Sequence, residues 1–173
     1  MSTWFPIWNE IKTLEAAGLL VPLALRVPGD AGRRAMFLTA DLSAALAATN
    51  LGQAEIFRYM ALRARLEHFV TSPVITKAYL KPLRPEADCV WEIVNRSPKP
   101  SLRVFGLFAT RDVFVATNHQ LRGALGGIDT PQWKQEIRQA RSEWRRLFQD
   151  DKVIRFDPLR GRLDEVISGA VYV

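Results

Sequence analysis

Cysteine and histidine are scarce in this sequence of 173 residues, which narrows the chemistry open to it. The single cysteine, Cys89, can form no disulfide within the chain. This excludes a disulfide-stabilised scaffold and fits a reducing cytoplasm. The two histidines, His68 and His119, have no cysteine near them in the sequence. We therefore expect no zinc site and no other bound metal.

Signatures of the common cofactor and nucleophile sites are also missing. The sequence has no Gly-x-Gly-x-x-Gly motif and no Walker loop, so the nucleotide-cofactor folds are disfavoured and we expect no cofactor. It has no Gly-x-Ser-x-Gly turn that would carry a nucleophilic serine. The chemistry that remains is that of charged side chains acting on a polyanion.

Long apolar segments are missing too. No run of about 18 uncharged apolar residues is present, so we expect no membrane-spanning helix. Residues 1–6 lack the basic segment and apolar run of a secretory signal. Hydrophobic residues make up 48% of the sequence and charged residues 24%, as in ordinary globular proteins. Because domains average roughly 150 residues, we expect one cytoplasmic domain over residues 1–173.

Acidic residues are too few after residue 54 to balance the basic ones. Residues 1–54 carry four basic and four acidic side chains, whereas residues 55–173 carry 20 basic and 14 acidic side chains. Arginine greatly outnumbers lysine, and its planar guanidinium suits phosphates and nucleobases. This excess indicates a polyanionic partner. The alternative is a basic surface that is merely solvated.

The first 40 residues predict an N-terminal extension made of a helix and a hairpin. Residues 9–17 are compatible with a short helix that Gly18 ends, because glycine tolerates a left-handed turn. Residues 19–27 and 34–39 are typical of two strands, and a Pro-Gly-Asp-Ala-Gly turn separates them.

Two helices follow in the sequence. Asp41 is a candidate N-cap for a helix over residues 42–49. Residues 53–70 have apolar side chains at helical spacing, which predicts one buried stripe. The stripe consists of Ile56, Tyr59, Leu62, Leu66 and Phe69. Such a helical hairpin commonly packs on a sheet.

Three segments rich in β-branched and aromatic residues predict the sheet. They are residues 89–95, 102–109 and 113–118. Their connections are too short for a parallel crossover, so these three strands must be antiparallel. We expect an α+β fold, with an antiparallel sheet of three or more strands packed against the helical hairpin and a C-terminal helix.

Thr130 and Pro131 predict the start of that last helix. Its core-facing residues are Trp133, Ile137, Ala140, Trp144 and Leu147, and the basic ridge beside them is Lys134, Arg138, Arg141 and Arg145. Residues 151–173 form a C-terminal tail, with short strands expected at 152–156 and 170–173. The core of the domain is expected over about residues 41–150.

The order of these segments resembles the RelE/HigB toxins of bacterial toxin–antitoxin systems, in particular the phage-derived HigB-like group. The resemblance covers about residues 53–148. It is carried by 80–83 (LKPL), 90–93 (VWEI), 102–105 (LRVF), the strand 113–119 followed by Gln120-Leu121-Arg122, and the Thr-Pro start and Glu-Ile-x-x-Ala of the last helix. One departure is that these relatives usually have adjacent lysines where this chain has Gln120-Leu121-Arg122.

The resemblance implies a metal-independent endoribonuclease that cleaves mRNA, on the ribosome or free, and is neutralised by an antitoxin protein. In such an enzyme the 2′-hydroxyl of the RNA attacks the adjacent phosphorus. Electrostatic stabilisation and acid–base groups of the protein supply the catalysis. The alternatives are a non-catalytic nucleic-acid or protein-binding module on the same fold, and a gyrase-directed toxin.

The resemblance points to Arg103, His119 and Arg122 as the catalytic residues. Arg103 would clamp the phosphate; alternatively, it pairs with Glu92 on the neighbouring strand. His119 would exchange protons near neutral pH. Glu92 is a candidate base or, equally, a structural partner of arginine. The residues expected to contact RNA are Lys81, Arg84, Arg111, Arg138 and Arg141.

Overall fold

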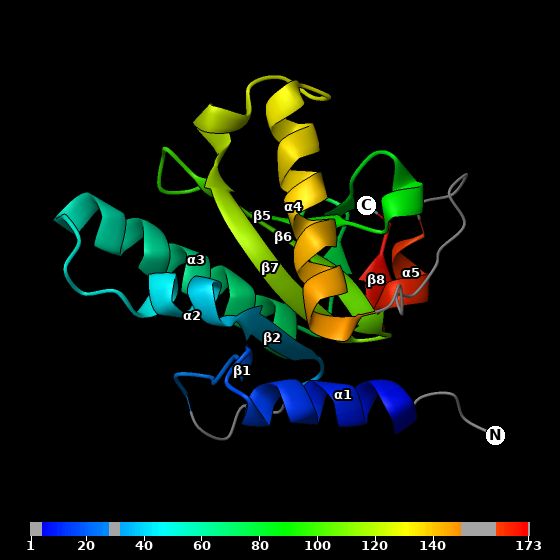
Figure 1. Ribbon diagram of the computed structural model, residues 1–173. Coiled ribbons are helices and arrows are strands. Elements are labelled where there is room, and N and C mark those ends of the chain that lie inside the picture. Colours follow the sequence, from blue (N-terminus) through cyan, green and yellow to red (C-terminus); the bar gives the residue numbers. More distant parts are fainter. Residues whose placement is uncertain (1–4, 28–31, 150–161, 173) are drawn as a thin grey trace.

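The protein is a mixed sheet of six strands with helices on both faces (Figure 1). The structure is a computed structural model that describes residues 5–27, 32–149 and 162–172. The order of strands across the sheet is β1 (Leu20–Pro22), β2 (Ala35–Thr39), β7 (Val113–Leu121), β6 (Leu102–Thr110), β5 (Trp91–Val94) and β4 (Leu80–Pro82). A separate pair of short strands, β3 (Ile75–Thr76) and β8 (Ala170–Val171), lies to one side. The expected α+β class is confirmed.

The helix and the hairpin expected in the first 40 residues are present. Helix α1 (Phe5–Ala16) begins before the expected residue 9 and ends ahead of Gly18, whose φ is +70°. Strands β1 (Leu20–Pro22) and β2 (Ala35–Thr39) pair antiparallel, but β1 is much shorter than the strand expected over residues 19–27. Residues 28–31 of the expected turn lie outside the described residues.

Helices α2 (Ala40–Ala47) and α3 (Gln53–Thr71) cover one face of the sheet. The cap of α2 is Thr39, whose Oγ1 accepts a hydrogen bond from the Leu42 amide, and not Asp41 as expected. Of the expected stripe, Leu62, Leu66 and Phe69 are buried in one apolar cluster with residues of β2, β5, β6 and β7. Tyr59 is partly buried against this cluster, and Ile56 is partly exposed.

The expected three-stranded meander is confirmed. Strands β5 (Trp91–Val94), β6 (Leu102–Thr110) and β7 (Val113–Leu121) pair antiparallel in that order. At the edge, β4 (Leu80–Pro82) pairs antiparallel with β5 and places Lys81 opposite Glu92.

The sheet as a whole is not antiparallel, so that part of the expectation is wrong. Strand β2 runs parallel to β7, with Ala35 opposite Val113. The connection between these two strands contains α2, α3 and the strands β3 to β6. A connection this long permits parallel as well as antiparallel pairing. Residues 35–39, counted above with the N-terminal extension, thus lie inside the same sheet as the meander.

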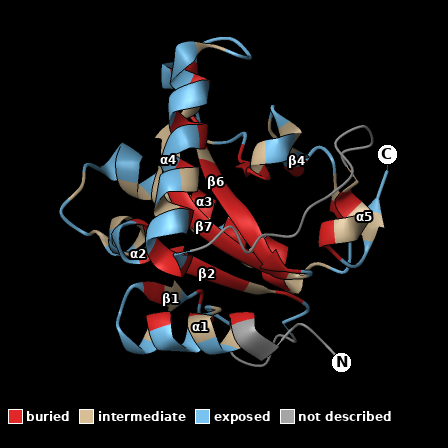
Figure 2. Cartoon of the chain, turned by 45° about the vertical axis from the view of Figure 1, so that its right-hand side comes forward, coloured by how far each residue is buried: buried red, intermediate tan, exposed pale blue. Residues whose placement is uncertain are grey.

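Helix α4 (Pro131–Phe148) and helix α1 cover the other face. As expected, Thr130 caps α4, with its Oγ1 accepting a hydrogen bond from the Trp133 amide, and Pro131 occupies the first turn. The expected apolar stripe of α4 is buried against the sheet. The strands are accordingly the most buried layer of the molecule (Figure 2).

The C-terminal residues pack beside the end of α3. They form α5 (Leu163–Val166) and β8 (Ala170–Val171), and β8 pairs parallel with β3 (Ile75–Thr76). The strand expected at 170–173 is thus present over two residues, and the one expected at 152–156 lies outside the described residues. Short 3-10 helices span Glu86–Asp88 and Arg122–Leu125.

A guanidinium joins these C-terminal residues to the body of the protein. The buried Arg34 donates hydrogen bonds to the carbonyl oxygens of Phe69 (2.9 Å), Ser72 (2.8 Å) and Ser168 (2.5 Å). Its Nε lies 3.4 Å from the carboxylate of Asp112. One side chain therefore links β2, the end of α3, the β6–β7 turn and the residues after α5.

Within the part of the chain that the structure describes, no helix is long and apolar enough to cross a membrane. The same residues contain no group of three or more histidine, cysteine, aspartate or glutamate side chains that could hold a metal ion.

Candidate active site

Glu92 lies at the centre of the candidate site, on β5 and on the face of the sheet covered by α4. Its side chain is only 9% exposed, and its Oε2 lies 3.5 Å from Nε of Arg103 on the neighbouring strand. That oxygen accepts no hydrogen bond from the described residues. This buried oxygen is therefore stabilised by its ion pair with Arg103, and Glu92 also belongs to the lining of the pocket described below.

Three cations surround this carboxylate. Lys81 lies opposite Glu92 on β4, Arg103 comes from β6, and Arg122 follows the end of β7. Burial raises the pKa of Glu92, and the positive charges of Arg103, Lys81 and Arg122, in decreasing order, oppose this shift. The meander and the edge strand therefore gather these side chains, which lie far apart in the sequence.

Arg103 is a fixed member of the group. It donates hydrogen bonds to the carbonyl of Asn95 and to Oγ of Ser101 (3.4 Å), and its side chain is 12% exposed. Burial lowers the pKa of Arg103, and the charge of Glu92 counteracts the effect. The ion pair with Glu92 on the neighbouring strand is therefore present. It was the alternative role expected for Arg103, and the arginine that forms it is mostly buried.

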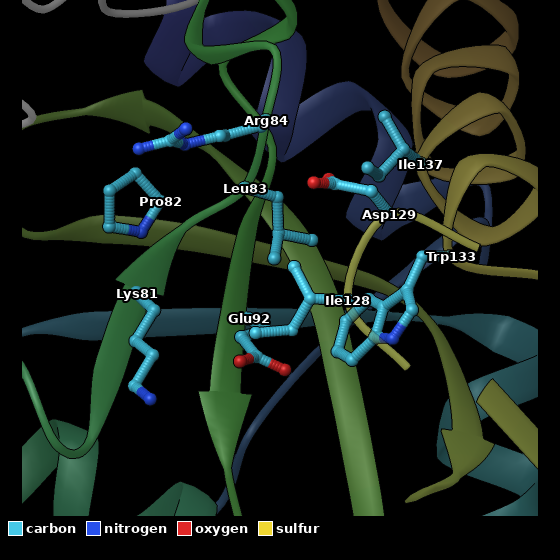
Figure 3. Close-up of a pocket in the computed structure, with 9 residues that line it drawn as sticks. All are labelled: Lys81, Pro82, Leu83, Arg84, Glu92, Ile128, Asp129, Trp133 and Ile137. Carbon is cyan, nitrogen blue, oxygen red and sulfur yellow. The ribbon is translucent and has the colours of Figure 1, made fainter. Parts of the chain in front are cut away.

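A pocket of about 190 Å³ opens beside this group, between the edge strand β4 and the start of α4 (Figure 3). Lys81 and Glu92 belong to its lining. The other lining residues are Pro82, Leu83, Arg84, Ile128, Asp129, Trp133 and Ile137. Arg122 adjoins the pocket, since its guanidinium lies 5.8 Å from the ring centroid of Trp133 and donates to the Gly126 carbonyl (2.6 Å).

A buried amide–carboxylate network holds α4 in place above the site. Asn118 donates to Oε2 of Glu136 (2.7 Å), and Gln120 donates to Oε1 of the same carboxylate (3.4 Å). Both amides lie on β7 and Glu136 on α4, so the network fixes the helix that carries Trp133 relative to the strands that carry Glu92 and Arg103.

His119 does not join this group, contrary to the expectation of a shared site with Arg103. In the β6–β7 register, His119 lies opposite Val104 and Arg103 opposite Gln120. Side chains alternate between the faces of a sheet, so His119 points toward α3, where its Nε2 lies 3.0 Å from the hydroxyl of Tyr59. Burial there lowers the pKa of His119.

Of the other residues expected to contact RNA, some line the pocket and some do not. Lys81 and Arg84 line the pocket. Arg111 lies in the β6–β7 turn, at the other end of these strands, and donates to the Ile167 carbonyl (3.5 Å). Arg138 is exposed and Arg141 is half-buried along α4, and neither lines the pocket.

Sequence reasoning missed part of the site. Trp133 was assigned to the core, and it does contact Phe105 there, but it also forms a wall of the pocket. Ile128 and Asp129 stand between a glycine pair and the helix cap and gave no signal of their own. Glu136 carried a usable signal, because it is a charged residue beside the apolar stripe of α4.

Comparison with protein families, curated proteins and solved structures finds no match for this chain. Assignment of a function therefore depends on the geometry of the Glu92 site.

Proposed function

We propose that the protein is an endoribonuclease of the RelE/HigB toxin type, which cleaves mRNA in the cytoplasm and is neutralised by an antitoxin protein. The observation that carries the proposal is the buried carboxylate of Glu92, which lines a pocket and interacts with the charges of Lys81, Arg103 and Arg122. The order of the elements also supports it. A helical hairpin, a three-stranded meander and a closing helix follow one another as the resemblance implies.

The reaction proposed is attack by a ribose 2′-hydroxyl on the adjacent phosphorus. The Glu92 carboxylate accepts the hydroxyl proton, the new bond from the 2′-oxygen to phosphorus forms, and the bond to the 5′-oxygen breaks. The products are a 2′,3′-cyclic phosphate and a 5′-hydroxyl end. Because burial raises the pKa of Glu92, its carboxylate is a stronger base than an exposed glutamate.

The cations have separate roles in this reaction. Arg122 stabilises the negative charge that develops on the phosphoryl oxygens. Lys81, exposed and opposite Glu92, protonates the departing 5′-oxygen. Arg103 is a positioning residue, because its hydrogen bond to Asn95 and its ion pair hold the Glu92 carboxylate in place.

A second candidate is a nucleic-acid-binding module without catalysis. The ion pair between Glu92 and Arg103 favours it, because a carboxylate held by arginine can serve structure alone. The two candidates differ in whether RNA is cut.

The test is to induce the protein in a bacterial host, follow growth and map transcript 5′ ends. The wild type is compared with Glu92→Gln, Arg122→Gln and the control Glu143→Gln, a carboxylate on α4 that pairs with Arg146 outside the pocket. We expect growth arrest and new 5′-hydroxyl ends for the wild type and the control, and neither for the two site variants.

Intact transcripts with the wild type would contradict the endoribonuclease. Arrest without cleavage, with DNA synthesis blocked, would indicate a gyrase-directed toxin. Equal cleavage by Glu92→Gln would show that Glu92 is not the base.

A further inference from the structure

The pocket beside Glu92 has two polar ends and an apolar middle (Figure 3). The ammonium of Lys81 and the carboxylate of Glu92 lie at one end, and the carboxylate of Asp129 and the side chain of Arg84 lie toward the other. Between them, Leu83 of the β4 side faces Ile128 and Trp133 of the α4 side. We call this pocket, with apolar side chains on two different elements, the slot.

The size of the slot limits what it can hold. Its volume is about 190 Å³. Sites for drug-sized ligands measure roughly 300–1,000 Å³, and a water molecule takes about 30 Å³ of liquid. The slot therefore fits one small flat ring system, whereas a whole nucleotide would extend beyond it.

The slot is continuous with the site proposed for the reacting phosphate. Lys81 and Glu92 belong to both, and the guanidinium of Arg122 stacks near the ring of Trp133, which forms the slot wall. Single-stranded RNA is read by splaying out a base and stacking it on side chains. A base placed here would adjoin the phosphate held by Arg122.

Asp129 determines which base the slot would prefer. The backbone of Asp129 is in the left-handed region, with φ of +66°, and its carboxylate lies at the mouth of the slot between Leu83 and Ile137. Among the described residues it makes no hydrogen bond and no ion pair. An ionised carboxylate only accepts hydrogen bonds, and its two oxygens can accept two parallel ones.

We propose that this slot binds one unpaired guanine of the RNA strand, next to the scissile phosphate, with guanine N1–H and N2–H donating to Asp129. The inference rests on the proposed endoribonuclease function. Guanine is favoured because its Watson–Crick edge presents these two donors side by side. Adenine and cytosine present a ring nitrogen acceptor beside a single amino group, and the acceptor would face the carboxylate.

The first test measures binding of the four nucleoside 3′-monophosphates to the purified protein by calorimetry. The variants are Asp129→Asn and Ile128→Ala, both at exposed positions, Ile128 being 83% exposed. Asparagine also tolerates the left-handed backbone, so Asp129→Asn should fold. The control is Asp41→Asn, an exposed aspartate on α2 that removes the same charge.

We expect guanosine 3′-monophosphate to bind on the order of tenfold more tightly than the other three to the wild type and the control. Asp129→Asn should abolish this preference. Ile128→Ala should weaken binding of all four nucleotides roughly threefold, because part of the apolar wall is removed. Equal binding of the four nucleotides by the wild type, or an unchanged preference in Asp129→Asn, would overturn the proposal.

The second test maps the bases flanking the cut sites in transcripts from cells that express the wild type or Asp129→Asn. Guanine enrichment that disappears in Asp129→Asn supports the slot. Cleavage with the same base preference in both would overturn the guanine slot and leave the endoribonuclease standing. Guanosine-selective binding without any cleavage would overturn the proposed reaction and leave the slot standing.

Discussion

Arg103 and His119 lie on paired strands one position out of register, and their side chains leave the sheet on opposite faces. Arg103 lies on the α4 face with Glu92, whereas His119 lies against Tyr59 of α3. The two groups therefore act in different surroundings. Among the described residues, the α4 face combines the buried Glu92 carboxylate, the charges of several cations and a pocket.

The first prediction concerns the identity of the proton acceptor. Glu92→Gln should lower the rate of RNA cleavage by about 10²–10⁴-fold, the usual contribution of a general base. His119→Asn should leave the rate close to that of the wild type, because the imidazole faces α3. Rates from transcript 5′-end mapping over time, at matched protein levels, check this. A loss in His119→Asn equal to that in Glu92→Gln would contradict it.

The second prediction concerns the pH dependence of stability. Burial raises the pKa of Glu92 in the folded protein, so between the ordinary glutamate value of about 4.3 and the raised value the folded state binds more protons than the unfolded state. The contribution of Glu92 to the free energy of unfolding is fully present below this window and decreases as pH rises through it.

Glu92→Gln stays neutral and should lack this decrease. Its free energy of unfolding, minus that of the wild type, should therefore increase with pH above about 4.3. Urea denaturation of both proteins at a series of pH values gives the difference, and a constant difference would show that the pKa of Glu92 is not raised.

The third prediction concerns Arg34. Arg34→Met should lower the free energy of unfolding by about 3–5 kcal/mol, because it removes a buried charge that satisfies three carbonyl oxygens and faces Asp112. The neighbouring exposed Arg33 provides the control, and Arg33→Met should have little effect. Denaturant midpoints measure both, and similar midpoints for the two variants would refute the structural role.

The fourth prediction concerns the close approach of β6 and β7 at Gly106. A Cβ atom at this position would collide with the Val115 carbonyl and lie 2.6 Å from the Phe114 ring. Gly106→Ala should therefore destabilise the protein by at least about 1–3 kcal/mol. Gly123→Ala is the matched control, since a Cβ there meets nothing within 4 Å. Thermal unfolding of both distinguishes the positions, and equal melting temperatures would show that the strands can separate at Gly106.

Local sequence signals predicted the local structure well. The Thr130-Pro131 start and apolar stripe of α4 are confirmed, as is the meander, because capping, periodicity and short connections are properties of neighbouring residues. The parallel pairing of β2 with β7 was not predictable in this way. An apolar strand indicates that it will be buried, but not which distant strand it will join.

The candidate site was predicted in part for the same reason. Lys81, Arg103, Arg122 and Glu92 were all singled out, and the strands bring them together. His119 was grouped with them because it is close to Arg122 in sequence, and only the exact register reveals that it faces the other side. Asp129 and Ile128 acquire a role through the pocket, which is a property of packing between β4 and α4.

The contacts of Arg34 also bear on when the protein becomes stable during its synthesis. The acceptor at Ser168 and the buried side chains of Leu163, Val166 and Ile167 are translated after all six strands of the main sheet, whereas Arg34 and β2 are translated before most of it. A nascent chain that has not yet emerged as far as Ser168 leaves a donor of this guanidinium without its acceptor and part of the α3 side exposed. The contacts that close the α3 side of the protein can therefore form only once the ribosome has synthesised the chain through residue 168.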